Sequence, residues 1–213
     1  MSKYNTYIFD FDYTLADSSR GIIMCFRYVL ENHGYHDIND YQIKLTIGKT
    51  LEESFSILTG ITDKETLTLY AKEYVKKADD WMTANTVLFP ETSPVLHALK
   101  ERGHKIGIVS TKYRYRIMEF VEKEFPKEFF DIIIGAEDVK AHKPDPAGLL
   151  LAINCLQSDL EKCLLYIGDS IIDAKTAQAI GVDFYGVLNG ITTREELLIY
   201  PHIKIADNLN DLV

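Results

Sequence analysis

The sequence contains few cysteines, a deficit of basic residues and no long apolar run. Its three cysteines, Cys25, Cys155 and Cys163, are odd in number, widely spaced and without a C-x-x-C pair, which argues against a disulfide framework or a zinc site. No window approaches the roughly 18 apolar residues that a membrane span needs. The N-terminal residues lack a basic stretch followed by an apolar run, so we expect no signal peptide and a cytoplasmic location.

Positive charge is scarce, because 23 Lys and Arg residues face 32 Asp and Glu residues and leave a formal net charge of −9. This balance disfavours non-specific binding to nucleic acid or to an anionic membrane surface. An anionic substrate would therefore require a local positive pocket or a metal ion. The apolar fraction of 46% is that of an ordinary globular protein, so the composition argues against disorder.

Five short apolar runs are nearly continuous in apolar residues, which is typical of parallel strands covered by helices on both faces. Helical patterns separate these runs. The predicted fold class is therefore α/β, with a doubly wound parallel sheet. The predicted strands cover residues 7–9, 105–109, 131–134, 163–167 and 184–188.

The interval between the first two predicted strands is much longer than a single crossover needs. It contains helical stripes, and Thr50 with Glu53 and Thr62 with Glu65 have the spacing of capping boxes that begin helices. We therefore predict a catalytic core over residues 1–16 and 86–213. A small helical cap domain over residues 17–85 interrupts it.

Polar clusters follow four of the predicted strands, at the edge where ligands bind in open α/β sheets. Asp10 and Asp12 follow the first strand, residues 110–112 the second and residues 168–170 the fourth, and a loop after the third carries Lys143. A solvated turn would explain the Asp pair taken alone. Ionised carboxylates at the end of a buried strand need water or a cation, however, and the ordered set of clusters favours a metal site that handles phosphate.

These residues resemble the motifs of the haloacid dehalogenase (HAD) superfamily of phosphohydrolases, in the branch with a helical cap inserted after the first motif. The match runs in order along the whole chain. Tyr13 departs from the pattern, since the family most often has Gly there. The matching residues are Asp10-Phe11-Asp12-Tyr13-Thr14 for the first motif, Ser110 for the second, Lys143 with Pro144 and Pro146 for the third, and Gly168-Asp169-x-x-x-Asp173 for the fourth.

The resemblance implies that Asp10 is a nucleophile that forms an aspartyl-phosphate. Asp12 would act as general acid toward the leaving group and then as base for water, and Thr14 would hold Asp12 in position. Mg²⁺ is the implied cofactor, held by the carboxylates of Asp10 and Asp169 and by the backbone carbonyl of Asp12.

The remaining motif residues would bind or support the phosphoryl group. Ser110 would donate its hydroxyl and a backbone N–H to that group, with Thr111 beside it, and Lys143 would neutralise its charge. Alternatively, Ser110 caps the next helix and Lys143 is a solvated loop charge. Asp173, supported by Ser170, would orient a metal-bound water or Lys143, or would serve only as an acid favoured at a helix N-terminus.

A helical cap would exclude bulky phosphoproteins and so favours a small phosphorylated metabolite as the substrate. Lys49 lies in a segment that resembles the cap loop of family members, where it would contact a substrate carboxylate or second phosphate, or else be a surface lysine. Lys112 receives no role, because many exposed lysines have none.

The best likeness is to phosphoglycolate phosphatases, so we expect an Mg²⁺-dependent phosphatase that hydrolyses a small phosphomonoester. We expect a monomer or weak homodimer, with no nucleic-acid or membrane partner. The alternatives are a β-phosphoglucomutase-like phosphotransferase, a pyrophosphatase, and a non-catalytic sensor that binds a phosphorylated ligand.

Overall fold

The computed structural model describes residues 3–157 and 163–213. The chain divides into two compact units, one made of Met1–Ala16 and Leu88–Val213 and the other of Asp17–Val87. The chain passes between them in two short strands, β2 (Ala16–Asp17) and β3 (Val87–Leu88), which pair with each other. In the described part of the chain, no helix combines the length and apolar character that crossing a membrane would require.

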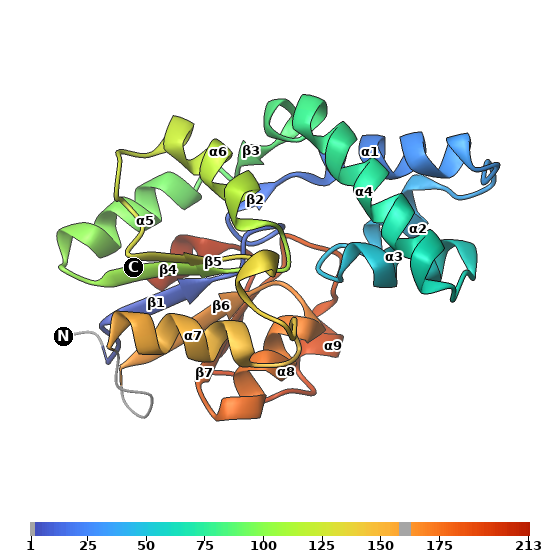
Figure 1. The fold of residues 1–213 in the computed structure, drawn as a ribbon. Helices are drawn as coiled ribbons and strands as arrows, with labels where there is room; N and C mark the ends of the chain where they lie inside the picture. Colours follow the sequence, from blue (N-terminus) through green and yellow to red (C-terminus); the bar gives the residue numbers. More distant parts are fainter. Residues whose placement is uncertain (1–2, 158–162) are drawn as a thin grey trace. The chain divides into compact units, whose positions relative to one another are not determined.

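The first unit is built on a six-stranded parallel sheet with the strand order β5-β4-β1-β6-β7-β8 (Figure 1). This confirms the predicted α/β class. The edge strand β8 was not predicted, because three residues with a lysine at the first position carry too short an apolar pattern. The strands are β1 (Thr6–Phe9), β4 (Lys105–Val109), β5 (Ile132–Ile134), β6 (Leu164–Gly168), β7 (Asp183–Val187) and β8 (Lys204–Ala206).

Helices cover both faces of this sheet, as Figure 1 shows. Successive side chains of a strand point to opposite faces, so Tyr7 and Phe9 pack with α5 and α6 in one apolar cluster, and Ile8 packs with α7 and α8 in another. All four residues of β1 are buried, which explains its continuous apolar pattern. The helices are α5 (Thr92–Glu101), α6 (Arg114–Glu124), α7 (Ala147–Leu156), α8 (Ile171–Ile180) and α9 (Arg194–Leu197), with short 3₁₀ turns at η2 (Ala136–Asp138) and η3 (Leu209–Leu212).

The second unit is helical and has its own apolar core, centred on α1 and α4. The Thr50 side chain accepts the N–H of Glu53 at the start of α3, as predicted, whereas α4 is capped by Asp63 and not by Thr62. Asp63 accepts the Thr66 N–H, so the cap lies one residue later than the sequence pattern indicated. The elements are α1 (Ser19–Asn32), α2 (Asp40–Lys44), α3 (Leu51–Thr59), α4 (Lys64–Trp81) and η1 (Thr83–Asn85).

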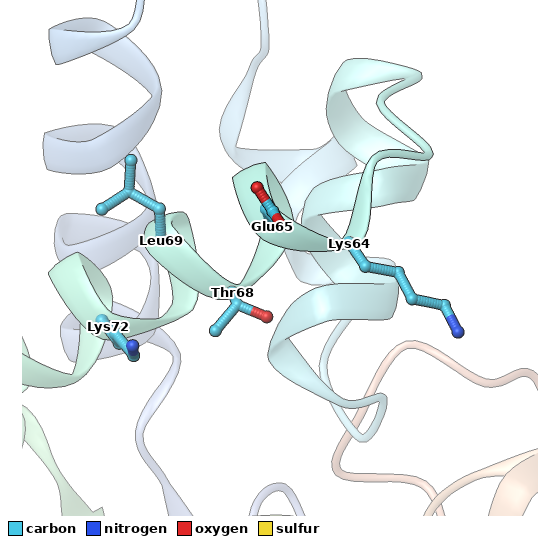
Figure 2. Close-up of a pocket in the computed structure, with 5 residues that line it drawn as sticks. All are labelled: Lys64, Glu65, Thr68, Leu69 and Lys72. Atoms are coloured by element: carbon cyan, nitrogen blue, oxygen red, sulfur yellow. The ribbon is translucent and has the colours of Figure 1, made fainter.

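A shallow hollow of about 330 Å³ lies on the surface of α4 (Figure 2). Its lining side chains are all exposed, so the hollow lacks the buried polar groups that a binding site for a charged ligand uses. The lining residues are Lys64, Glu65, Thr68, Leu69 and Lys72.

Candidate active site

Acidic side chains meet where β1 and β6 end, because these strands are hydrogen-bonded neighbours in the sheet. The Asp10 N–H donates to the Ile167 carbonyl at 2.8 Å, which continues the pairing one residue beyond β1. Asp169 directly follows β6. Oxygens of Asp10, Asp169 and Asp173 lie within 4.8 Å of one another. Side chains that are far apart in the sequence are thus close enough to share one cation.

Lys143 brings positive charge to this cluster from the loop before α7. Its Nζ lies 2.9 Å from Asp10 Oδ1 and donates to Asp173 Oδ1 at 2.6 Å. The side chain is only 4% exposed, so Lys143 is not the solvated loop charge of the alternative interpretation. Burial alone would lower the pKa of Lys143, but the charges of Asp10 and Asp173 outweigh it and hold that pKa well above its usual value. The ammonium is therefore charged whenever these acids are ionised.

Asp173 both contacts Lys143 and lies in the first turn of α8, the two interpretations that the sequence left open. Its Oδ1 accepts from Lys143, and its Oδ2 accepts from the N–H and hydroxyl of Ser170 at 3.2 and 2.6 Å. Ser170 Oγ accepts the Asp173 N–H in return, which completes a capping box at the start of α8. A Cβ at Gly168 would lie 2.4 Å from the Cβ of Asp173, so only glycine fits there. The helix cap thus fixes the carboxylate that holds Lys143.

The charges of the cluster fit a bound cation. Lys143 forms ion pairs with Asp10 and Asp173, two of the three buried carboxylates of this cluster, so these ion pairs leave the negative charge in excess. Burial is the main cause that raises the pKa of Asp10 to about 6, and burial with the charges of Asp173 and Asp10 raises the pKa of Asp169 well above its usual value. Asp10 Oδ1 is buried and accepts no hydrogen bond from any described residue, although Lys143 Nζ is near it. Hard oxygen ligands of this kind suit Mg²⁺.

Two residues that sequence reasoning missed shape this cluster. The Tyr166 hydroxyl on β6 donates to Asp173 Oδ1 at 2.9 Å and accepts from Lys143 Nζ at 3.3 Å. A Cβ at Gly190 would lie 2.0 Å from Asp169 Oδ2, so a side chain there would displace the carboxylate. The sequence gives no sign of either contact. Tyr166 belongs to an apolar strand, and Gly190 lies outside the matched motifs.

Thr14 and Ser110 make other contacts than those predicted. The Thr14 hydroxyl donates to Asp169 Oδ1 at 3.3 Å, so it supports the acid after β6, not Asp12. The Ser110 N–H donates to the Ile134 carbonyl at 3.0 Å, because β4 and β5 continue to pair there, and is therefore committed to the sheet. Ser110 does not cap the next helix either, since the N-cap position of α6 is Tyr113. The Ser110 hydroxyl accepts the Lys112 N–H at 3.3 Å, and its donation to a phosphoryl group stays a prediction.

The turn after β1 holds Asp12 and Tyr13. Asp12 accepts hydrogen bonds from Lys112, which the sequence left without a role. Tyr13 has a φ of 60°, in the left-handed region that favours glycine, so a glycine would adopt this conformation more easily. Thr111 is half-buried in the turn after β4.

Lys49 belongs to the second unit. Its Nζ forms an ion pair at 2.9 Å with Oε1 of Glu53, in the first turn of α3, and the Lys49 side chain is 28% exposed. An exposed pair of this kind is weak, so it leaves Lys49 able to exchange partners at little cost. Its predicted contact with substrate stays a prediction.

Comparisons with known proteins identify the family of this chain. The family model described as haloacid dehalogenase-like hydrolase matches residues 7–187. The solved structure of a haloacid dehalogenase-like hydrolase from Bacteroides fragilis has 60% sequence identity and a TM-score of 0.97, over 99% of this chain and 100% of that one. A protein from Clostridium acetobutylicum that is described as a predicted phosphatase shares the fold, with 24% identity and a TM-score of 0.90 over 99% of this chain and 97% of that one.

A relative from Bacillus pumilus, named pyrophosphatase PpaX, is 29% identical over 213 residues, which are 100% of this chain and 96% of that protein. The resemblance seen in the motifs therefore extends along the whole length of the chain. The chain belongs to the haloacid dehalogenase-like hydrolase family and is an enzyme of that family.

Proposed function

We propose that this protein is an Mg²⁺-dependent phosphatase that hydrolyses a small phosphomonoester through an aspartyl-phosphate at Asp10. The observation that carries this proposal is the buried cluster at the strand ends, where Lys143 lies 2.9 Å from Asp10 and the oxygens of Asp10, Asp169 and Asp173 gather within 4.8 Å. Phosphoryl transfer to a carboxylate requires a carboxylate nucleophile and positive charge, and this buried site supplies a carboxylate, an ammonium and further acids that can hold a cation.

Each residue would contribute one step or charge. The Asp10 carboxylate attacks phosphorus, and Asp12 protonates the leaving oxygen and later accepts a proton from the attacking water. Lys143 and the Ser110 hydroxyl stabilise the charge of the transferring group. Mg²⁺, when held by the carboxylates of Asp10 and Asp169 and the Asp12 carbonyl, offsets the repulsion between an anionic nucleophile and an anionic substrate.

The second unit would act as a cap. Its separate apolar core lets it be a folded body of its own, which a cap that excludes water from the reaction requires. Lys49 in this unit would recognise a second anionic group of the substrate. We therefore propose a small phosphorylated metabolite, with no nucleic-acid or membrane partner.

Pyrophosphate is the second candidate substrate. Two relatives, at 29% and 28% identity over 100% and 99% of this chain, are named pyrophosphatase PpaX. In pyrophosphate hydrolysis the leaving group is phosphate, which needs less protonation by a general acid than an alkoxide leaving group does. The two substrates therefore differ in how much they depend on Asp12.

The test is phosphate release from a panel of small phosphate esters and from pyrophosphate, with Mg²⁺ and with EDTA. We expect Mg²⁺-dependent turnover that Asp10→Asn lowers at least about a thousandfold. Asp207→Asn, which alters an exposed acid paired with Arg194 in the same unit, is the control and should keep full activity. Trapping of labelled phosphate on the wild-type chain, and its loss in Asp10→Asn, would report the covalent intermediate.

The assay also separates the alternatives. A sugar monophosphate that is turned over only with a sugar bisphosphate present, with little phosphate released, would favour the phosphotransferase. Binding of phosphorylated ligands without turnover of any ester or of pyrophosphate would refute the phosphatase and favour a sensor.

A further inference from the structure

Lys112 contacts the proposed proton donor of the reaction, and the steps above give this lysine no role. Its Nζ donates to Asp12 Oδ1 at 2.8 Å and to Oδ2 at 3.2 Å. The side chains of Lys112 and Asp12 are 9% and 12% exposed. Among the ion pairs of the described residues, only those of Lys143 have both partners less exposed. This is therefore not an ordinary surface pair, which water would screen.

Hydrogen bonds hold both the backbone and the side-chain ammonium of Lys112. Its N–H donates to Ser110 Oγ at 3.3 Å after β4, and its carbonyl accepts the Ala136 N–H at 3.0 Å after β5. Its Nζ lies 5.6 Å from the ring centre of Phe11, which is fully buried, within range of a cation–π attraction. Lys112 thus presents a fixed hydrogen-bond donor to Asp12, which lies in the turn after β1.

We propose that Lys112 is a positioning residue that holds the Asp12 carboxyl group in the orientation needed for proton transfer to the leaving oxygen. The inference rests on the proposed phosphatase function. Lys112 is closer to Oδ1 than to Oδ2, so it keeps an acceptor on Asp12 when Oδ2 carries the proton. The remaining exposure of Asp12 leaves that proton accessible to a substrate.

The proton has a defined path in this scheme. In the first step an Asp10 oxygen bonds to phosphorus, the bond from phosphorus to the leaving oxygen breaks, and the Asp12 proton passes to that oxygen. In the second step water attacks phosphorus, Asp12 takes the proton of the water, and the bond between Asp10 and phosphorus breaks. Both steps need Asp12 in one orientation.

A comparison of two esters isolates this effect. Phenyl phosphate and 4-nitrophenyl phosphate are similar in size, but phenolate is the more basic leaving group and depends more on protonation by Asp12. The value of kcat/KM covers the steps up to cleavage of the ester bond. Its ratio between the two esters therefore reports proton donation and is insensitive to the later hydrolysis.

We expect Lys112→Met to lower kcat/KM for phenyl phosphate at least about tenfold more than for 4-nitrophenyl phosphate, since positioned acid catalysis contributes about 10²–10⁴-fold. Asp12→Asn should show the same preference, and Lys112→Arg should restore part of the loss. The double variant Lys112→Met with Asp12→Asn should be no slower than Asp12→Asn alone. Lys127→Met, at an exposed lysine of the same unit, is the control and should change neither ester.

Several results would overturn the proposal. An equal loss for both esters, with weaker inhibition by inorganic phosphate, would show that Lys112 binds the phosphoryl group. An unchanged ratio, or an additive loss in the double variant, would show that it does not act through Asp12. Should Lys112→Met fail to fold, Lys112→Ala, which also removes the donor to Asp12, tests the same ratio. If the wild-type chain turns over neither ester nor any compound of the panel, the phosphatase function fails and the role of Lys112 falls with it, whereas wild-type turnover with an unchanged ratio in Lys112→Met overturns the role of Lys112 alone.

Discussion

Tyr166 and Tyr185 allow a matched test of the buried polar network, which is the set of hydrogen bonds that joins Lys143, Tyr166 and Asp173. Removing a tyrosine hydroxyl is expected to have different effects at the two positions. The side chains lie on the neighbouring strands β6 and β7 and are 0% and 2% exposed. The Tyr166 hydroxyl donates to Asp173 and accepts from Lys143. The Tyr185 hydroxyl is buried and makes no hydrogen bond with any described residue.

The magnitudes follow from these contacts. Tyr166→Phe removes a hydrogen bond to a charged acceptor, which costs about 1.5–3 kcal/mol of the free energy of unfolding. Tyr185→Phe removes a buried hydroxyl that has no partner in the described structure, so the free energy of unfolding should stay the same or rise by up to about 1 kcal/mol. For a chain of this size, each kcal/mol changes Tm by about 2–4 °C.

Urea unfolding and thermal unfolding of the wild type and both variants would measure this difference, with circular dichroism as the signal. Tyr166→Phe should also lower kcat, because Lys143 loses one of the groups that hold it. Equal destabilisation by the two substitutions, or a neutral Tyr166→Phe, would refute the assignment of the Tyr166 hydroxyl to the network.

Three further predictions concern the metal site and the cap. Gly190→Ala should weaken Mg²⁺ binding in calorimetry while leaving the far-ultraviolet circular dichroism unchanged, because the added Cβ would meet Asp169 Oδ2; unchanged Mg²⁺ affinity would contradict this. Burial raises the pKa of Asp10 from 3.8 to about 6, so the folded metal-free protein binds this proton more tightly than the unfolded chain does. The contribution of Asp10 to the free energy of unfolding is therefore full below pH 4 and is lost as the pH rises through 6. Mg²⁺ needs the ionised carboxylate, so it should raise Tm more at pH 7.5 than at pH 5, and an equal rise at both values would argue against Asp10 as a ligand. Lys49→Ala should raise KM for a substrate with a second anionic group with little change in Tm, since its ion pair with Glu53 is exposed; an unchanged KM would leave Lys49 a surface residue.

The architecture of the first unit could be predicted because it depends on patterns that are local in the sequence. Continuous apolar runs predict strands buried on both faces, and polar clusters after Phe9, Val109 and Ile167 predict where ligand-binding side chains lie. Parallel pairing of neighbouring strands then brings Asp10 and Asp169 to one edge. The edge strand β8 escaped this reasoning because its three residues carry too little pattern to stand out from a loop.

The partner of each polar side chain could not be predicted in the same way. Thr14 contacts Asp169, Lys112 contacts Asp12, and the hydroxyl of Tyr166 contacts Asp173. A hydrogen bond depends on distances of a few tenths of an ångström, which result from how separate strands pack. Residue type and spacing say only which groups are available.

The order of elements and the types of residue at the strand ends were therefore determined by the sequence itself, because hydrophobic periodicity and turn chemistry act over a few neighbouring residues. Only the tertiary structure decided which charges meet. Burial of Asp10, Asp169, Asp173 and Lys143 together raises the cost of any unbalanced charge, and that cost is a property of the packed site and not of any segment of the chain.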